Sequence, residues 1–162
     1  IITELEHQLE AGLSTGSDPG HSVRLKGVID RVDRWNGMTR IIDYKTGRVD
    51  SSELRIRSWE ELRVPGKNDK LFQLLFYAGL YLNQKKEDDQ EIEAGIYSFR
   101  NLGQGFLTAE LPASVPIAAA MHEFEALLGG LIRELYDVSV PFVQTAEVKV
   151  CEYCSFKSIC HR

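Results

Sequence analysis

The sequence predicts an α/β or α+β domain in which a mixed central sheet is flanked by helices. Three observations support this fold class: a hairpin marked by Asn36-Gly37, an apolar helical segment at residues 70–86, and a strand-like run at residues 92–99. The order of strand, hairpin, helix and strand is consistent with a small mixed sheet that carries helices. With 162 residues, 43% of them hydrophobic, the chain can form one proper core, and we expect a single soluble domain over residues 1–162.

The N-terminal segment does not indicate one structure. Residues 1–11 fit either a short helix or a strand, because their apolar side chains match neither period clearly. Residues 13–22 crowd Ser, Thr, Gly, Asp and Pro together and predict a turn, after which a strand begins near Val23. Because the chain starts with Ile rather than Met, we expect it to be a piece of a longer protein.

The hairpin at residues 27–47 is the clearest local signal in the chain. Asn36-Gly37 lies between two runs rich in β-branched residues, and Asn-Gly is the dipeptide most typical of a two-residue type I′ turn. In such a turn Trp35 faces Met38, which fixes the register of the two strands. The other cross-strand pairs follow by counting outward from this pair.

The predicted register brings two acids and a lysine together. Asp30 lies directly opposite Asp43, and Lys45, two residues further along the strand, shares their face. Like charges placed opposite each other, with Cβ atoms about 4.5 to 5.5 Å apart, are destabilising unless something such as a cation lies between them. Mg²⁺ is held by one or two carboxylates together with water and phosphate oxygens. The pattern therefore predicts metal-dependent phosphodiester hydrolysis, in which Lys45 orients the nucleophile and stabilises the developing charge.

A solvated hairpin is the alternative explanation of these charges. A single Asp-x-Lys sequence is common on protein surfaces and is weak evidence for catalysis. The second acid strengthens the catalytic interpretation, because Asp30 is flanked by Val28 and Val32 and faces a neighbourhood that contains Ile41. A carboxylate in apolar surroundings is unfavourable unless it has a partner.

Charge is unevenly distributed along the chain. The net charge of −5 argues against a protein that coats nucleic acid in general. Residues 24–48, in contrast, hold seven basic side chains against three acids. We expect this basic field to hold a nucleic-acid backbone by phosphate contacts, with a merely solvated hairpin as the alternative. No apolar run approaches the roughly 20 residues of a membrane span and no charged-then-apolar leader is present, so neither a membrane partner nor secretion is expected.

A polar segment at residues 48–68 follows the hairpin. Its final breaker is Pro65-Gly66, and Trp59 and Leu62 are the only residues in it that we expect to anchor in the core. We expect this segment to border the substrate cleft.

Residues 70–86 are apolar nearly all round, which predicts a buried helix capped by Asn68 or Asp69. Gln73 and Tyr77 stand four residues apart on one face of this helix. A buried Gln needs partners or costs about 1 to 3 kcal/mol, and an active-site network would supply them. Taken alone, these residues favour the alternative, a Gln bonded to a loop carbonyl and a Tyr at the rim of the core.

The second half of the chain predicts further strands. The charge run at residues 85–91 predicts a solvated loop. A strand is expected at residues 92–99, a turn at residues 101–105 and another strand at residues 106–111.

Pro116 opens a predicted helix that extends to about Asp137 and is loosened or bent at Gly129-Gly130. Its exposed face includes His122. Helical spacing predicts a core stripe formed by Met121, Phe124, Leu127, Leu128, Leu131 and Leu135.

The tail at residues 148–162 carries all three cysteines, Cys151, Cys154 and Cys160, in a C-x2-C-x5-C pattern. An odd number of cysteines without a leader excludes a disulfide framework and indicates a reducing compartment, so we expect a cytoplasmic protein. Three thiolates at this spacing can hold one metal centre. Zn²⁺ and a 4Fe–4S cluster both normally take four ligands, so the fourth is either absent or His161.

Three strings in this chain together resemble the RecB/AddB-like nuclease domains of the PD-(D/E)XK superfamily. They are GVIDRVD at residues 27–33, IIDYKTG at residues 41–47 and QLLFY at residues 73–77. The corresponding family patterns occur in this order, and the three together are far more specific than any one. The resemblance covers most of the chain.

The resemblance implies a restriction-endonuclease-like core and DNA cleavage that depends on Mg²⁺ or Mn²⁺. It implies active-site roles for six residues, namely Asp30, Asp43 and the Tyr44 carbonyl as metal ligands, Lys45 as the catalytic lysine, and Gln73 and Tyr77 as lining residues. With this resemblance, the active-site explanation of the Gln and Tyr pair becomes the favoured one. The resemblance also favours a strand for residues 1–11.

The chain departs from the family pattern at its start. The family usually places a helix with a metal-ligating His or Glu before the first core strand, whereas this chain begins with what resembles that strand. We therefore expect the first core helix to be missing. His7 is a tempting substitute ligand, but it lies in the expected strand, and we expect it to be an ordinary surface residue.

The resemblance extends to the cysteine tail. In AddB-like nucleases a similar C-terminal triplet joins one cysteine far upstream to bind a 4Fe–4S cluster. For the parent protein the favoured expectation is therefore an iron–sulfur cluster. Zn²⁺ is the next alternative, and cysteines that bind no metal are the least favoured.

The implied function is an exonuclease within a helicase–nuclease type protein of DNA repair and recombination. Its partners would be DNA and a helicase–nuclease subunit. The alternative is a catalytically silent DNA-binding or partner-docking module with a nuclease-like fold. The intact set of Asp30, Asp43 and Lys45 favours the enzyme.

Overall fold

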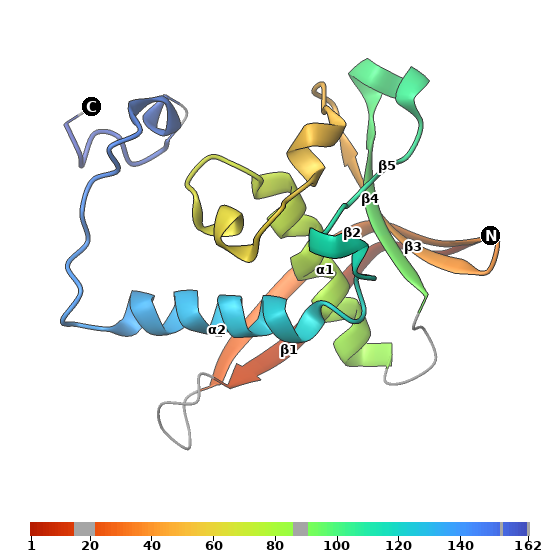
Figure 1. The fold of residues 1–162 in the computed structure, drawn as a ribbon, viewed down its shortest axis with the longest axis horizontal. Coiled ribbons are helices and arrows are strands. Elements are labelled where there is room, and N and C mark those ends of the chain that lie inside the picture. Colours follow the sequence, from red (N-terminus) through yellow and green to blue (C-terminus); the bar gives the residue numbers. More distant parts are fainter. Residues whose placement is uncertain (15–21, 86–90, 153, 162) are drawn as a thin grey trace.

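The computed structural model describes residues 1–14, 22–85, 91–152 and 154–161. A five-stranded sheet, ordered β1-β2-β3-β4-β5, forms its centre (Figure 1). The strands are β1 (Ile2–Ser14), β2 (Ser22–Trp35), β3 (Met38–Lys45), β4 (Ile92–Ser98) and β5 (Leu107–Thr108). The two α-helices are α1 (Asp69–Lys85) and α2 (Met121–Tyr136). The predicted fold class, a mixed sheet with helices, is confirmed.

The sheet is mixed because the chain crosses over once. β3 and β4 are parallel and joined through α1, while the other neighbouring strands are antiparallel. A parallel connection requires such a crossover, and the helix in it returns over one face of the sheet. The main core lies between α1 and this face. Its fully buried side chains include Leu71, Leu74, Leu75, Ile29, Val32, Ile41 and Ile96.

The hairpin has the predicted turn and register. Asn36 and Gly37 have φ angles of 51° and 87°, as a type I′ turn requires at both central positions. The β2–β3 ladder begins at the pair Trp35–Met38 and runs to Arg31–Ile42 without a shift. Residues 1–11 are in a strand, as the resemblance favoured.

The predicted turn at residues 13–22 and the charge run at residues 85–91 fall largely outside the described residues. The strand expected at residues 106–111 is shorter than predicted. After β5, the N–H of Ala109 donates a 2.8 Å hydrogen bond to the carbonyl of Ala94, and Glu110 forms an isolated bridge with Arg55.

The segment after β3 is anchored more firmly than the sequence indicated. Leu62 is buried and Trp59 packs half-buried against the core, as expected. Val49, Leu54 and Ile56 are buried as well, so the expectation that Trp59 and Leu62 are the only anchors was wrong. The segment contains two 3₁₀ helices, Ser51–Leu54 and Trp59–Arg63. These short turns direct alternate apolar residues into the core, which composition does not reveal.

Helix α2 differs from its prediction in three respects. It begins at Met121, five residues after Pro116, and it continues through Gly129-Gly130. Leu135 is 58% exposed, and Ile132 is buried in its place. Leu135 lies three residues after Ile132 and so continues the same face, but in this last turn of α2 that face is no longer covered, and Tyr136 beside it is exposed as well. His122 is exposed, as expected. No helix in the described ranges is long and apolar enough to cross a membrane.

Candidate active site

The two predicted acids lie next to each other at the end of the hairpin strands. Asp43, on β3, is only 3% exposed, while Asp30, on β2, is partly exposed. The backbone N–H of Tyr44 donates a hydrogen bond of 2.7 Å to Oδ2 of Asp30. This contact ties the Asp30 carboxylate to the β3 backbone beside Asp43, whereas the regular ladder ends one pair earlier, at Arg31–Ile42.

An irregularity in β1 accompanies Asp30. Glu6, which lies between the pairs His7–Ile29 and Leu5–Arg31, has a φ of 46°, which is rare for a non-glycine residue. Ile29 and Val32 are both fully buried, although strict alternation would place them on opposite faces. The alternation of core-facing and outward-facing residues along β2 therefore shifts by one residue at Asp30. Nothing in the local sequence of β2 marks this change.

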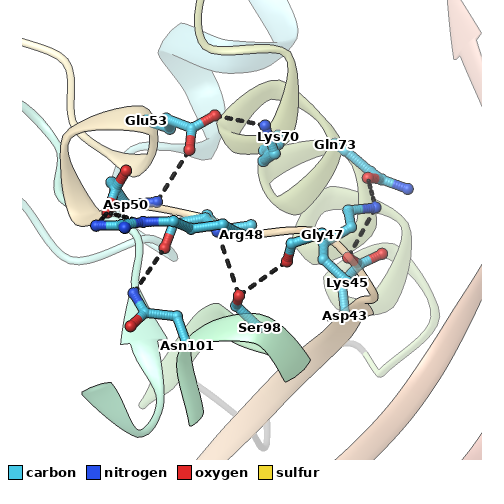
Figure 2. Close-up of polar contacts among 11 residues, drawn as sticks. Asp43, Lys45, Gly47, Arg48, Asp50, Glu53, Lys70, Gln73, Ser98 and Asn101 are labelled. Atoms are coloured by element: carbon cyan, nitrogen blue, oxygen red, sulfur yellow. Dashed lines mark hydrogen bonds and ion pairs between the residues drawn. The ribbon is translucent and has the colours of Figure 1, made fainter. Parts of the chain in front are cut away.

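Lys45 joins the acids to helix α1. Its Nζ lies 2.8 Å from Oδ2 of Asp43 and donates a 2.8 Å hydrogen bond to Oε1 of Gln73. Figure 2 shows Lys45 between these two partners. Nε2 of Gln73 in turn donates to the Tyr77 hydroxyl at 2.8 Å. The structure thus brings together the five predicted side chains, and the partners of Gln73 are side chains of this group rather than a loop carbonyl.

Burial raises the pKa of Asp43, and the charge of Asp30 raises it further, while Lys45 opposes both. Oδ2 of Asp43 is buried and receives no well-directed hydrogen bond from a described residue, although Lys45 forms an ion pair with it. A buried carboxylate oxygen that lacks a donor, beside a second acid, is the environment that a divalent cation stabilises. The donor set therefore fits Mg²⁺ or Mn²⁺.

The protein supplies few ligands to such an ion. Within the described ranges, no three His, Cys, Asp or Glu side chains gather closely enough to hold a metal. Two carboxylates leave the remaining positions to water, phosphate oxygens and backbone carbonyls, which suits Mg²⁺. The ring of Tyr44 stacks on Tyr97 and Phe99 and is turned away from the acids, so only its carbonyl is a candidate ligand.

His7 does not join the acids. It is half-buried rather than a plain surface residue, and its Nε2 lies 3.1 Å from Oε2 of Glu4. Glu4 also pairs with Lys85 at the end of α1.

Several basic residues of residues 24–48 bond to acids other than Asp30 and Asp43. Asp33, which is 1% exposed, accepts hydrogen bonds of 2.7 and 2.8 Å from Arg40 and a further one from Arg31. These three residues lie on the opposite face of the sheet from Asp43. Arg31 and Arg40 are therefore not placed to hold a phosphate backbone beside the acids, and the expected basic field there is smaller than the sequence indicated. The predicted register itself pairs Asp33 with Arg40 and could have identified this cluster.

Three further basic residues of the segment also have acidic neighbours. Arg24 and Lys26 pair with Glu10, and Arg48 pairs with Asp50. These are exposed pairs, which a phosphate backbone can displace at little cost.

The cysteine tail lies apart from the sheet, beyond the far end of α2 (Figure 1). No disulfide joins Cys151, Cys154 and Cys160, and all three are partly exposed. They do not form a metal-binding group as the described chain holds them. The tail touches the core domain where Val150 packs against Gly66.

Comparison with known proteins is consistent with this geometry. A family model described as the PD-(D/E)XK nuclease superfamily matches residues 2–161. A solved structure titled "Crystal structure of SSO0001" is 18% identical with a TM-score of 0.42, and the match covers 97% of this chain and 59% of that one. This chain therefore spans about three fifths of that protein's length. No curated protein matches. From the family match, the chain belongs to the PD-(D/E)XK nuclease superfamily.

Proposed function

We propose that this chain is a metal-dependent deoxyribonuclease in which Asp30 and Asp43 hold Mg²⁺ or Mn²⁺ and Lys45 assists phosphodiester hydrolysis. The observation that supports it best is the junction at Lys45, whose ammonium contacts Asp43 and Gln73 at 2.8 Å each. Superfamily membership supports nuclease chemistry independently of this geometry.

Each side chain has a distinct role in this proposal. The two carboxylates, with the Tyr44 carbonyl as a further ligand, bind the cation, which supplies Lewis-acid chemistry to the phosphoryl group and the attacking water. Lys45 carries a positive charge that orients the nucleophile and stabilises the negative charge developing on phosphate oxygens. Gln73 holds Lys45 through Oε1, and Tyr77 holds the amide of Gln73.

Cleavage of end-labelled DNA tests the proposal. Wild-type protein should release label with Mg²⁺ and not with EDTA, and Asp43→Asn should be inactive while it still folds and binds DNA. Asp50→Asn, an exposed acid in the following loop, is the matched control and should remain active. If wild type and Asp43→Asn are equally inert while both bind DNA, the alternative function, a silent DNA-binding or partner-docking module, replaces the enzyme.

We further propose that the protein is a RecB/AddB-like exonuclease that acts in DNA repair and recombination together with a helicase–nuclease subunit. The support is the order of the three strings at residues 27–33, 41–47 and 73–77. The same assay tests the mode of cleavage, because an exonuclease degrades linear DNA and spares circular DNA. Cleavage of both forms would contradict this proposal and leave the nuclease intact.

The cysteine tail has no assigned part in the reaction. Its thiols do not fit a metal centre as the described chain holds them, because no three potential ligands gather. An iron–sulfur cluster in the parent protein, with Zn²⁺ as the alternative, stays a prediction that iron and zinc analysis of purified parent protein would test. No disulfide joins the three cysteines, which supports the proposal of a cytoplasmic location.

A further inference from the structure

A single buried hydroxyl forms hydrogen bonds to the backbone just beyond Lys45 and anchors it. Oγ of Ser98, the last residue of β4, donates a 2.8 Å hydrogen bond to the carbonyl of Gly47. The same oxygen accepts a 3.2 Å hydrogen bond from the N–H of Val49. Figure 2 shows Ser98 below the loop that leaves β3. One side chain therefore satisfies two backbone groups of a loop that has left the sheet.

The surroundings make this contact rigid. Ser98 is 1% exposed and Val49 is fully buried, so water cannot replace the hydroxyl. Asn101 adds a hydrogen bond of 3.3 Å from Nδ2 to the carbonyl of Val49. An unsatisfied buried backbone group costs about 1 to 3 kcal/mol, so removal of the hydroxyl would force the loop to rearrange.

These hydrogen bonds of Ser98 restrain Lys45 through the backbone that connects them. β3 ends at Lys45, and the parallel ladder pairs Lys45 with Ser98 itself. The backbone pairing between β3 and β4 ends here, and the Ser98 side chain bonds the next residues of the chain in its place. A lysine at a strand end has a flexible side chain, and its Nζ keeps its position between Asp43 and Gln73 only if its backbone does not fray.

We infer that Ser98 is a positioning residue for Lys45, which it holds in place through Gly47 and Val49. The inference rests on the proposed nuclease function, because Lys45 is the group whose placement matters. Ser98 itself touches no reacting atom. Misplacement of a catalytic group by about 1 Å can reduce a rate up to a hundredfold, so the loss of this contact should be visible in the rate.

Single-turnover cleavage with saturating Mg²⁺ and DNA gives the first measurement. Ser98→Ala should lower the maximal rate by at least about tenfold and leave the DNA concentration for half-maximal rate unchanged. Ser98→Thr, which keeps the hydroxyl, should restore most of the rate. Asn101→Ala removes only the bond to the Val49 carbonyl and should give a smaller loss in the same direction.

The matched control is Thr39→Val. Thr39 is 3% exposed and lies at the other end of β3, so this variant also alters a buried hydroxyl of the same strand. It should lower thermal stability without lowering the maximal rate. If Thr39→Val slows cleavage as much as Ser98→Ala does, general destabilisation explains the loss and the inference fails.

Hydrogen exchange separates this inference from the proposed function. The Val49 amide should be protected in wild type and in Thr39→Val, and should exchange faster in Ser98→Ala. If wild type does not cut DNA, the proposed function fails, while the exchange of Val49 still tests the anchoring by Ser98. If wild type cuts DNA and Ser98→Ala keeps its full rate, the inference alone fails.

Discussion

Nε2 of Gln73 donates a 2.8 Å hydrogen bond to the hydroxyl of Tyr77, one helical turn further along α1. Oε1 of the same amide accepts from Lys45, whose ammonium group is only a donor, so the contact with Lys45 determines which end of the amide faces it. The Tyr77 hydroxyl, which can donate or accept, bonds the other end and holds the amide in place.

Tyr77→Phe should lower the maximal rate of cleavage by up to about tenfold, because one hydrogen bond contributes about 0.5 to 1.5 kcal/mol. The DNA concentration for half-maximal rate should not change. Steady-state kinetics would measure both quantities, with Phe76→Leu on the same helix as the control. A wild-type rate in Tyr77→Phe would mean that the orientation of Gln73 does not limit catalysis.

Asp43→Asn should stabilise the metal-free fold at neutral pH. The folded-state pKa of Asp43 is raised above its unfolded value, so its ionisation disfavours folding once the pH exceeds the unfolded pKa of about 3.9. The gain in melting temperature should therefore be larger at pH 7 than at pH 4. Thermal denaturation without metal at both pH values would measure this difference, and an equal gain at both would contradict the assignment.

Addition of Mg²⁺ should raise the melting temperature of wild type, because a ligand that binds only the folded state stabilises it. Asp43→Asn should show a much smaller increase. Asp50→Asn, whose carboxylate lies in the exposed pair with Arg48, should respond as wild type does. If all three proteins shift equally, the cation binds somewhere other than the acid pair.

Asp33→Asn should destabilise the protein by about 3 to 5 kcal/mol, since it leaves two arginines without their buried partner. Burial raises the pKa of Asp33, but hydrogen bonds from Arg40 and Arg31 outweigh it, and the net pKa is lowered. This stabilisation is present above the unfolded pKa of about 3.9 and is lost as pH falls through the folded value. Urea denaturation should show a larger difference in stability between wild type and Asp33→Asn at pH 7 than at pH 3.

Gly27→Ala should destabilise the fold by about 1 to 3 kcal/mol through overpacking. A Cβ at Gly27 would lie 2.8 Å from Cδ1 of Leu80 and 3.1 Å from Cε1 of Tyr77. Gly12→Ala is the control, because it also lies in a strand but has no atom within 4 Å of the added carbon. Equal urea midpoints for the two variants would show that helix α1 can shift away from β2.

The sequence predicts those parts of the site that depend on local geometry. Asn36-Gly37 determines a turn whose backbone angles allow one register, and this register follows by counting. The shift in alternation at Asp30 was not predictable in this way, because it accompanies a distortion at Glu6 in the neighbouring strand. Ser98 was missed for a similar reason. A serine at a strand end has no distinguishing feature in the sequence, because the loop to which it bonds is identified only by the structure.

Helix α2 illustrates the limit of periodicity. Its first apolar residues were assigned correctly to the buried face, but the assignment failed at Leu135. Packing against α1 and the 3₁₀ segment before it determines where the helix leaves the core, and the pattern of apolar residues carries no information about that point.

The crossover through α1 determines when the site is complete. The contact between Lys45 and Gln73 spans 28 residues, whereas the acids are brought together by a two-residue turn. A hairpin forms in microseconds and needs little loop entropy, but the longer loop must close before the lysine has its second partner. On these timescales the two carboxylates, which repel each other, come together before Gln73 of α1 reaches Lys45. Only the molecule with α1 docked brings all the proposed active-site side chains together, so we expect an incompletely folded chain not to cut DNA.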